Sequence, residues 1–289
     1  MRPGVWHAVL AYSLWGLLPI YWKWLQHVPA LQLLAHRILW SFVALALVLV
    51  VRREPGALRE AARGRGPALL AAVMIGVNWL VYIWAVNAGY IVETSLGYFI
   101  NPLLNVLLGV LCFRERLRPE QWAALGLATA GVGALTLAYG RLPWIALTLA
   151  GTFAGYGIVK KRTCAGPVAG LTLETALLLP LALAWLAWCA AVPSASAAVP
   201  VDPRTLALLA GGGVVTTIPL LLFAHAAPQI PLSLIGLLQY LAPTLQFLLG
   251  VLVYREPFSR SQAIGFGLVW AGLLLFAAES WMSRTTKPH

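Results

Sequence analysis

The sequence contains very little charge. Only 10% of its 289 residues are Asp, Glu, Lys or Arg, whereas 61% are hydrophobic. A soluble domain carries about 25% charged residues, so this chain could not cover the surface of a soluble protein of its size. The composition therefore predicts an integral membrane protein.

The sequence also lacks the motifs of common enzymes. Cys112, Cys164 and Cys189 are scattered, which excludes a disulfide framework and a zinc site. No Walker loop, HExxH, GxSxG or kinase signature is present. No segment between hydrophobic runs is longer than about 20 residues, which leaves no room for a soluble catalytic domain. We expect no cofactor, no metal and no ATP-driven transport by this chain alone.

Acidic residues are scarce, with 9 Asp and Glu against 20 Lys and Arg. The basic residues lie in short clusters between hydrophobic runs, which is typical of membrane orientation and lipid contact and not of nucleic-acid binding. With the N-terminus inside, the inner segments hold 14 Lys and Arg and the outer segments hold five. The positive-inside rule therefore predicts that both termini face the cytoplasm.

Hydrophobic runs long enough to cross a bilayer, about 20 residues each, recur along the whole chain. They predict an all-α membrane protein with ten transmembrane helices. The predicted spans are residues 5–24, 31–51, 67–86, 94–113, 121–139, 142–159, 168–191, 205–225, 231–254 and 261–281.

An internal repeat joins the two halves of the chain. Residues 102–131 align without a gap on residues 243–272, and 14 of the 30 positions are identical. The copy lies five spans later, so the two units have opposite orientations in the membrane. We predict two five-helix repeats, residues 1–140 and 141–289, in an inverted 5+5 arrangement. Such repeats are the architecture of many secondary transporters, although duplication retained for stable packing is the alternative interpretation.

Several motifs carry a family resemblance over essentially the whole chain. They are Ala11-Tyr12-Ser13-Leu14-Trp15-Gly16, His36-Arg37-Ile38-Leu39-Trp40-Ser41, Gly97-Tyr98-Phe99-Ile100-Asn101-Pro102-Leu103, and the Arg-Glu pairs 114–115 and 255–256. With these motifs the sequence resembles the RarD branch of the EamA transporters, in the drug/metabolite transporter superfamily. The resemblance implies a ten-helix permease of the bacterial inner membrane. The name of the branch is associated with a predicted chloramphenicol-related permease, but the resemblance does not fix a substrate.

Three ionisable residues lie about two turns inside predicted spans, where a mid-helix charge costs about 2.5–3.5 kcal/mol on insertion scales. They are His36, Arg37 and Glu174. A functional interpretation is that His36 or Glu174 titrates during transport and couples it to protons. The alternative is packing, with Glu174 neutralising Arg37 or binding hydroxyls.

A polar stripe recurs in both repeats. Tyr98, Asn101 and Asn105 follow helical spacing in span 94–113, and Gln239 and Gln246 occupy repeat-related positions in span 231–254. These side chains would line the substrate path or join helices to one another. Three prolines within spans are predicted hinges: Pro19, Pro102 and Pro243.

Aromatic residues within the spans complete the predicted substrate site. The candidates that could stack on an apolar or aromatic substrate are Tyr12, Trp15, Trp79, Tyr82 and Tyr156, with Asn78 on the same helix face as Tyr82. Core packing is the alternative for each of them. The Arg-Glu pairs predict a local ion pair or helix cap.

Together these features predict a secondary permease that moves a small organic metabolite or drug by alternating access, with export as the expected direction. The substrate is expected to be neutral, zwitterionic or amphipathic, because Arg37 is the one cation available to a buried site. The alternatives are a non-transporting assembly subunit and, less favoured, an intramembrane enzyme. We expect membrane lipid and a small molecule as partners, and a monomer or homodimer.

Overall fold

The computed structural model describes residues 3–62, 65–113, 119–161, 166–192, 202–226, 229 and 238–285. Within these residues every regular element is a helix. The elements are α1 (Pro3–Trp24), α2 (Ala30–Val51), α3 (Pro55–Ala61), α4 (Arg65–Asn87), α5 (Ile91–Phe113), α6 (Pro119–Tyr139), α7 (Trp144–Lys161), α8 (Pro167–Ala191), α9 (Pro203–Ala226), α11 (Leu241–Leu248), η3 (Leu249–Val253) and α12 (Arg260–Thr285). The π-helical turn η3 continues α11 directly.

Each predicted span overlaps one of these helices. The predicted span 231–254 is helical from Leu241 in the part of the chain that is described, and residues 230–237 lie outside it. The short helix α3 was not predicted, since its sequence is polar and brief. Four helical segments are long and apolar enough to cross a membrane, and 122–138, 144–159 and 241–253 are shorter apolar helices. The four long segments are Ala30–Val51, Gly66–Asn87, Pro167–Ala191 and Pro203–Phe223.

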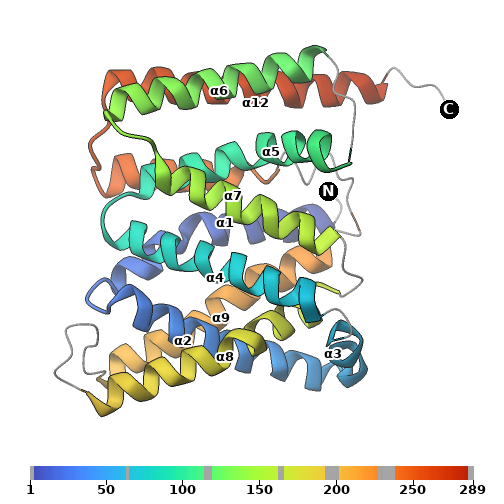
Figure 1. Ribbon diagram of the computed structural model, residues 1–289, viewed down its shortest axis with the longest axis vertical. Coiled ribbons are helices and arrows are strands. Elements are labelled where there is room, and N and C mark those ends of the chain that lie inside the picture. The colour runs from blue at the N-terminus through green and yellow to red at the C-terminus, as the bar shows by residue number, and fades with distance from the viewer. Residues whose placement is uncertain are drawn as a thin grey trace.

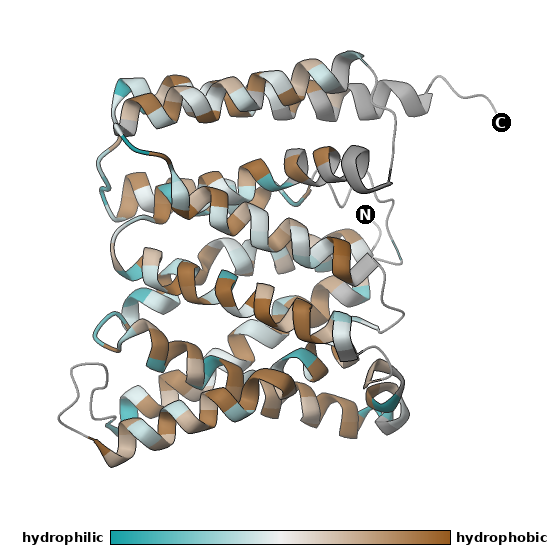
Figure 2. Cartoon of the chain, in the orientation of Figure 1, coloured by the Kyte–Doolittle hydropathy of each residue, from teal (hydrophilic) through white to brown (hydrophobic). Residues whose placement is uncertain are grey.

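Large apolar side chains cover the outside of the bundle. Leu137 is 84% exposed, and Val50, Leu181 and Leu274 are each more than 70% exposed. Figure 2 shows hydrophobic residues along the outward faces of helices at every level of the molecule. A soluble protein rarely exposes apolar surface so continuously, whereas a helix that contacts lipid does so along its length.

The helices lie roughly side by side in a tall stack (Figure 1). The pair α6 and α12 forms one end of the stack, α2, α8 and α9 form the other, and α1, α4, α5, α7 and α11 lie between. The chain enters α1 and leaves α12 on the same side of the bundle.

Each extensive helix contact has a counterpart in which the corresponding helices of the two halves of the chain change places. Helix α1 packs on α9 and α11, and α7 packs correspondingly on α4 and α5. Helix α2 packs on α9 as α8 packs on α4. The remaining extensive contacts join α2 to α8, α5 to α11 and α6 to α12. These pairs map onto one another when α1, α2, α4, α5 and α6 are exchanged for α7, α8, α9, α11 and α12.

Glycines allow the closest helix contacts. A Cβ atom on Gly97 in α5 would lie 2.8 Å from the Ala146 carbonyl oxygen in α7. A Cβ atom on Gly213 in α9 would lie 2.4 Å from the carbonyl carbon and oxygen of Trp40 in α2. Small residues at such crossings let membrane helices approach closely.

Candidate substrate-binding region

Buried hydroxyl groups in the bundle fall into two classes. Most bond back to the carbonyl three or four residues earlier in their own helix, as Thr172 and Thr175 do in α8. Ser41 in α2 and Thr216 and Thr217 in α9 have buried hydroxyls without a hydrogen-bond partner among the described residues. Since membrane interiors supply no water by default, such hydroxyls are available to a bound molecule.

Asn78 in α4 joins three helices. Its Nδ2 donates to the Leu149 carbonyl at 3.0 Å and to Thr152 Oγ1 at 3.0 Å, both in α7. The Tyr98 hydroxyl in α5 donates to its Oδ1 at 3.4 Å. The candidate residues Asn78 and Tyr98 are therefore brought together, and Thr152 joins them.

Aromatic rings continue from this point toward Glu174. The rings of Tyr82 and Tyr98 lie 5.8 Å apart, and Phe153 is 6.2 Å from both Tyr98 and Tyr156. The Tyr156 hydroxyl donates to Glu174 Oε2 at 3.0 Å. The Glu174 carboxylate, which is 2% exposed, thus contacts a predicted aromatic residue, in agreement with the alternative that it binds hydroxyls.

Arg37 lies between two tryptophans. Its guanidinium carbon is 4.1 Å from the ring centroid of Trp79 and 5.0 Å from that of Trp22. Tyr82 belongs to the same buried cluster as Trp22, and Tyr98 packs against that cluster. Its Nε and Nη1 atoms are buried without an acceptor among the described residues.

Pro19, a predicted hinge, is linked to Gln246 through the carbonyl of Trp15. Proline has no N–H, so the carbonyl four residues earlier loses its helical donor. That carbonyl belongs to Trp15, and Gln246 Nε2 in α11 donates to it at 3.2 Å. The Oε1 atom of Gln246 is buried and has no partner among the described residues, and the same holds for Asn101 Oδ1 in α5.

The candidates in α1 pack on α9. The rings of Tyr12 and Trp15 lie 5.5 Å apart, and both contact Phe223, at 6.0 and 5.9 Å. This arrangement joins the two residues to each other and to α9.

The other predicted prolines differ in position. Pro102 lies inside α5, whereas Pro243 lies in the first turn of α11, where an N–H would have no intrahelical partner anyway. The side chain of Asn105 lies outside the described residues. Gln239 lies two residues before the start of α11 and is partly buried.

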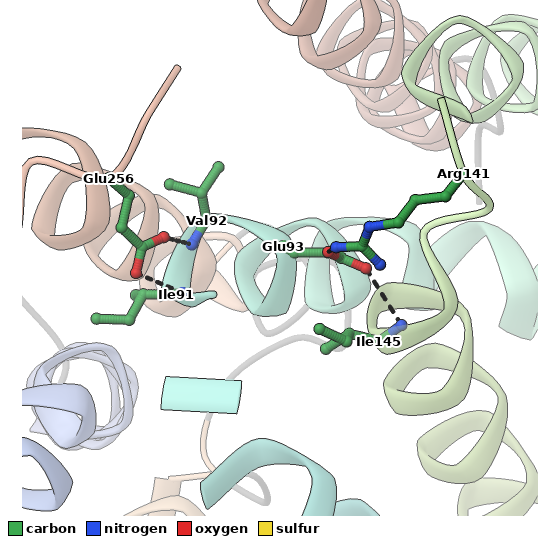
Figure 3. Close-up of polar contacts among 6 residues, drawn as sticks. All are labelled: Ile91, Val92, Glu93, Arg141, Ile145 and Glu256. Carbon is green, nitrogen blue, oxygen red and sulfur yellow. Dashed lines mark hydrogen bonds and ion pairs between the residues drawn. The ribbon is translucent and has the colours of Figure 1, made fainter. Parts of the chain in front are cut away.

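Two carboxylates cap helices of other segments at one end of the bundle (Figure 3). Glu256 accepts hydrogen bonds from the backbone N–H groups of Ile91 and Val92, at 2.7 and 2.8 Å. Burial raises the pKa of Glu256, while the two N–H bonds and Lys23 oppose that shift. The helix-cap alternative predicted for this Arg-Glu pair agrees with these bonds, but the capped helix is α5, 165 residues away in the chain, and not a neighbouring one.

Glu93 makes the second cap. It accepts from the Ile145 N–H at the start of α7 at 3.2 Å and from Arg141 Nη2 at 3.0 Å. At the same end, Lys23 donates to the Asn87 carbonyl, and His27 is 3.2 Å from Thr205 Oγ1. These contacts join the helix ends on the side of the membrane that the distribution of Lys and Arg predicts to be the outer one.

A surface depression of about 290 Å³ lies at this end and contains none of the predicted site residues. Its lining is Gln26, His27, Val28, Pro29, Ala30, Trp84, Asn87 and Ala88. No cluster of three His, Cys, Asp or Glu side chains suited to a metal occurs in the part of the chain that the structure describes.

Some polar residues of this region were not among the predicted site residues. Ser41 and Thr152 are common in membrane helices and carry no signal of their own. Ser41 follows Arg37 by four positions, a spacing that places both on one helix face and that would have identified it. The contact of Glu256 with α5 joins segments far apart in the chain and has no local signal.

Comparison with known proteins gives relatives over the full length of the chain. The EamA-like transporter family model matches residues 2–137. The chain is 45% identical to the "Uncharacterized transporter YojE" of Bacillus subtilis, covering 100% of this chain and 98% of that one. It is 45% identical to "Protein RarD" of Streptomyces exfoliatus (96% and 89% covered) and 40% identical to "Protein RarD" of Escherichia coli (99% and 98% covered).

The fold also has a solved counterpart. A protein of known crystal structure superposes with a TM-score of 0.62 over 95% of this chain and 97% of that chain, at 21% sequence identity. At that identity the similarity concerns the fold alone. The Bacillus subtilis relative is named a transporter, and several helices are apolar enough to span a membrane. The chain is therefore a multi-pass membrane protein that belongs to the EamA-like transporter family, in its RarD branch.

Proposed function

We propose that this protein is a secondary permease that moves a small organic metabolite or drug across the bacterial inner membrane by alternating access, in the export direction. It uses no ATP and modifies no substrate. The family places it among transporters of the drug/metabolite type. The substrate class, direction and mechanism are our proposal.

The observation that carries the proposal is a group of buried polar atoms without partners among the described residues. They come from helices of both halves of the chain: Arg37 and Ser41, Tyr82, Asn101, Thr216 and Thr217, and Gln246. Leaving a buried polar group unpaired costs about 1–3 kcal/mol, so a protein retains several of them when a ligand or its hydration water uses them. A scaffold or assembly subunit has no need for such a set.

Alternating access is supported by the exchange of helix contacts between the halves. An inverted 5+5 repeat, residues 1–140 and 141–289, predicts two related packings that open to opposite sides. The pairing of α1 with α9 and α11, against α7 with α4 and α5, has the form that such a repeat requires. Pro19, Pro102 and Pro243 are the proposed hinges.

The carboxylate caps favour a conformation closed on the outer side. Glu256 joins the second half of the chain to α5, and Glu93 joins α5 to the start of α7. With both termini in the cytoplasm, all of these contacts lie on the periplasmic side. Opening toward the periplasm would have to break some of them.

The test is flux through proteoliposomes that contain the purified protein. The panel holds amphenicols, amino acids, nucleosides and cationic drugs, offered one at a time without ATP. We expect saturable, protein-dependent movement of at least one class, and a tenfold or greater loss in Asn101→Ala (about 1.4 kcal/mol per tenfold). Gly126→Ala, at an exposed glycine with open space around it, is the matched control.

Absence of flux for the whole panel, with no shift in melting temperature, would overturn the permease proposal and favour the assembly-subunit alternative. A chemically altered substrate would favour the enzyme alternative.

A further inference from the structure

We propose that Arg37 is the recognition site for a single carboxylate on the substrate. The inference rests on the proposed permease function and narrows its substrate class. It concerns a small molecule with one carboxylate and an apolar or aromatic body, whether zwitterionic or amphipathic.

The first step is the burial of Arg37. The residue is 5% exposed and lies seven residues after the start of α2. A charge at such depth in a membrane protein is costly and is normally paired. Among the described residues Arg37 makes no ion pair with a carboxylate, and its close contacts are the rings of Trp22 and Trp79.

The second step is the fate of Glu174, the buried acid expected to neutralise Arg37. Its carboxylate accepts the Tyr156 hydroxyl at 3.0 Å, which joins α7 to α8. The internal counter-ion predicted for Arg37 is thus engaged elsewhere. An anion from outside the chain would complete the site.

The third step is the form of the guanidinium site. Trp22 and Trp79 contact the guanidinium through their rings, which stabilises the charge without using its N–H donors. Nε and Nη1 remain buried without an acceptor among the described residues. Guanidinium groups bind carboxylates by parallel N–H···O bonds, so the missing partner is an acceptor and its best form is a carboxylate.

The neighbouring polar atoms agree with an anion. The Tyr82 hydroxyl, in the same buried cluster as Trp22, has no partner among the described residues. The Ser41 hydroxyl, one turn along the same face of α2, is likewise without one. Both groups donate hydrogen bonds. One cation with two hydroxyl donors suits a monoanion and offers too little charge for a phosphate ester.

The experiment compares matched probes that differ only in the carboxylate. Phenylacetate and phenylacetamide form one pair, L-phenylalanine and L-phenylalaninamide form the second, and chloramphenicol is the uncharged reference. Binding to the detergent-purified full chain is followed by the shift in melting temperature, and movement is followed in proteoliposomes. We expect the carboxylate of at least one pair to bind about tenfold or more tightly than its amide, because a site built for a polar group rejects the analogue without it.

Three variants connect this preference to Arg37. Arg37→Gln should abolish the preference, and Arg37→Lys should retain part of it. Tyr82→Phe keeps the ring and removes the hydroxyl, so it should weaken carboxylate binding several-fold. If Arg37→Gln does not fold, Tyr82→Phe still tests the inference. Arg260→Gln, at an exposed cation at the start of α12, should change nothing.

The unliganded melting temperature separates recognition from structure. Removal of a buried charge without a partner should leave the melting temperature of Arg37→Gln equal to or above that of the wild type. A structural ion pair would give a marked fall and overturn the inference. Equal binding of acid and amide, or movement of chloramphenicol alone that Arg37→Gln does not impair, would overturn it while the permease proposal stands. No binding or movement of any probe would overturn both.

Discussion

Glu256 caps the first turn of α5 from the far end of the chain: its two carboxylate oxygens lie 2.7 and 2.8 Å from the backbone nitrogens of Ile91 and Val92. The first N–H groups of a helix have no partner within it. A neighbouring glycine makes this approach feasible, because a Cβ atom on Gly250 would lie 2.8 Å from Val92 Cγ2. On this side of the bundle, hydrogen bonds from α5 to Glu256 therefore join the two halves of the chain.

Replacement of Glu256 should destabilise the protein through this contact. We expect Glu256→Ala to cost about 2 kcal/mol, since it leaves two backbone donors unpaired, and Glu256→Gln to cost about 1 kcal/mol. Melting followed by tryptophan fluorescence measures the effect, with Arg260→Gln as the exposed control. A melting temperature unchanged in Glu256→Ala would show that the cap contributes nothing to stability.

Gln246 and Pro19 should behave as a coupled pair. Gln246→Leu removes the donor to the Trp15 carbonyl and should cost about 1–3 kcal/mol. In the Pro19→Ala background residue 19 regains its N–H and can bond that carbonyl within α1, so the same change should cost less. A double-mutant cycle in melting experiments measures the coupling. Strict additivity of the two changes would contradict this account.

Gly213 should not tolerate a side chain. A methyl group there would overlap the backbone of Trp40 in α2, so Gly213→Ala should separate α2 from α9 and destabilise the bundle by about 1–3 kcal/mol. Gly133→Ala, in α6 with open space around its Cβ position, should instead be neutral or stabilising by up to about 1 kcal/mol. Purified yield and melting temperature compare the two, and an equal loss in both would refute the packing at Gly213.

Glu174 is the candidate for proton coupling. If transport is coupled through it, Glu174→Gln should retain folding and abolish the effect of an imposed pH gradient on flux. Tyr156→Phe, which removes the hydrogen bond of 3.0 Å to the carboxylate, should weaken the same effect. His36→Gln tests the other titratable candidate in parallel. If flux through Glu174→Gln still depends on the pH gradient, this residue is excluded as the coupling group.

Composition and hydropathy were enough to predict a membrane protein and the positions of its long helices. Scarce charge and ten long hydrophobic runs exclude a soluble fold, because exposed apolar surface is stable only in lipid. The gap-free alignment of residues 102–131 on residues 243–272, with 14 of 30 positions identical, predicts the internal repeat. Helical spacing also grouped Asn78 with Tyr82 and Tyr98 with Asn101, since residues three or four positions apart share a helix face.

Which helix faces contact one another could not be predicted from the sequence and is known from the three-dimensional arrangement. Glu174 contacts Tyr156 and not Arg37, Gln246 bonds a carbonyl 231 residues earlier, and Glu256 caps a helix of the other half. Hydropathy and spacing describe each helix alone and contain no information about its rotation against a neighbour or the pairing of distant polar atoms. Those choices depend on the combined packing of all the helices, in which glycine contacts, proline-freed carbonyls and buried charges must be satisfied together.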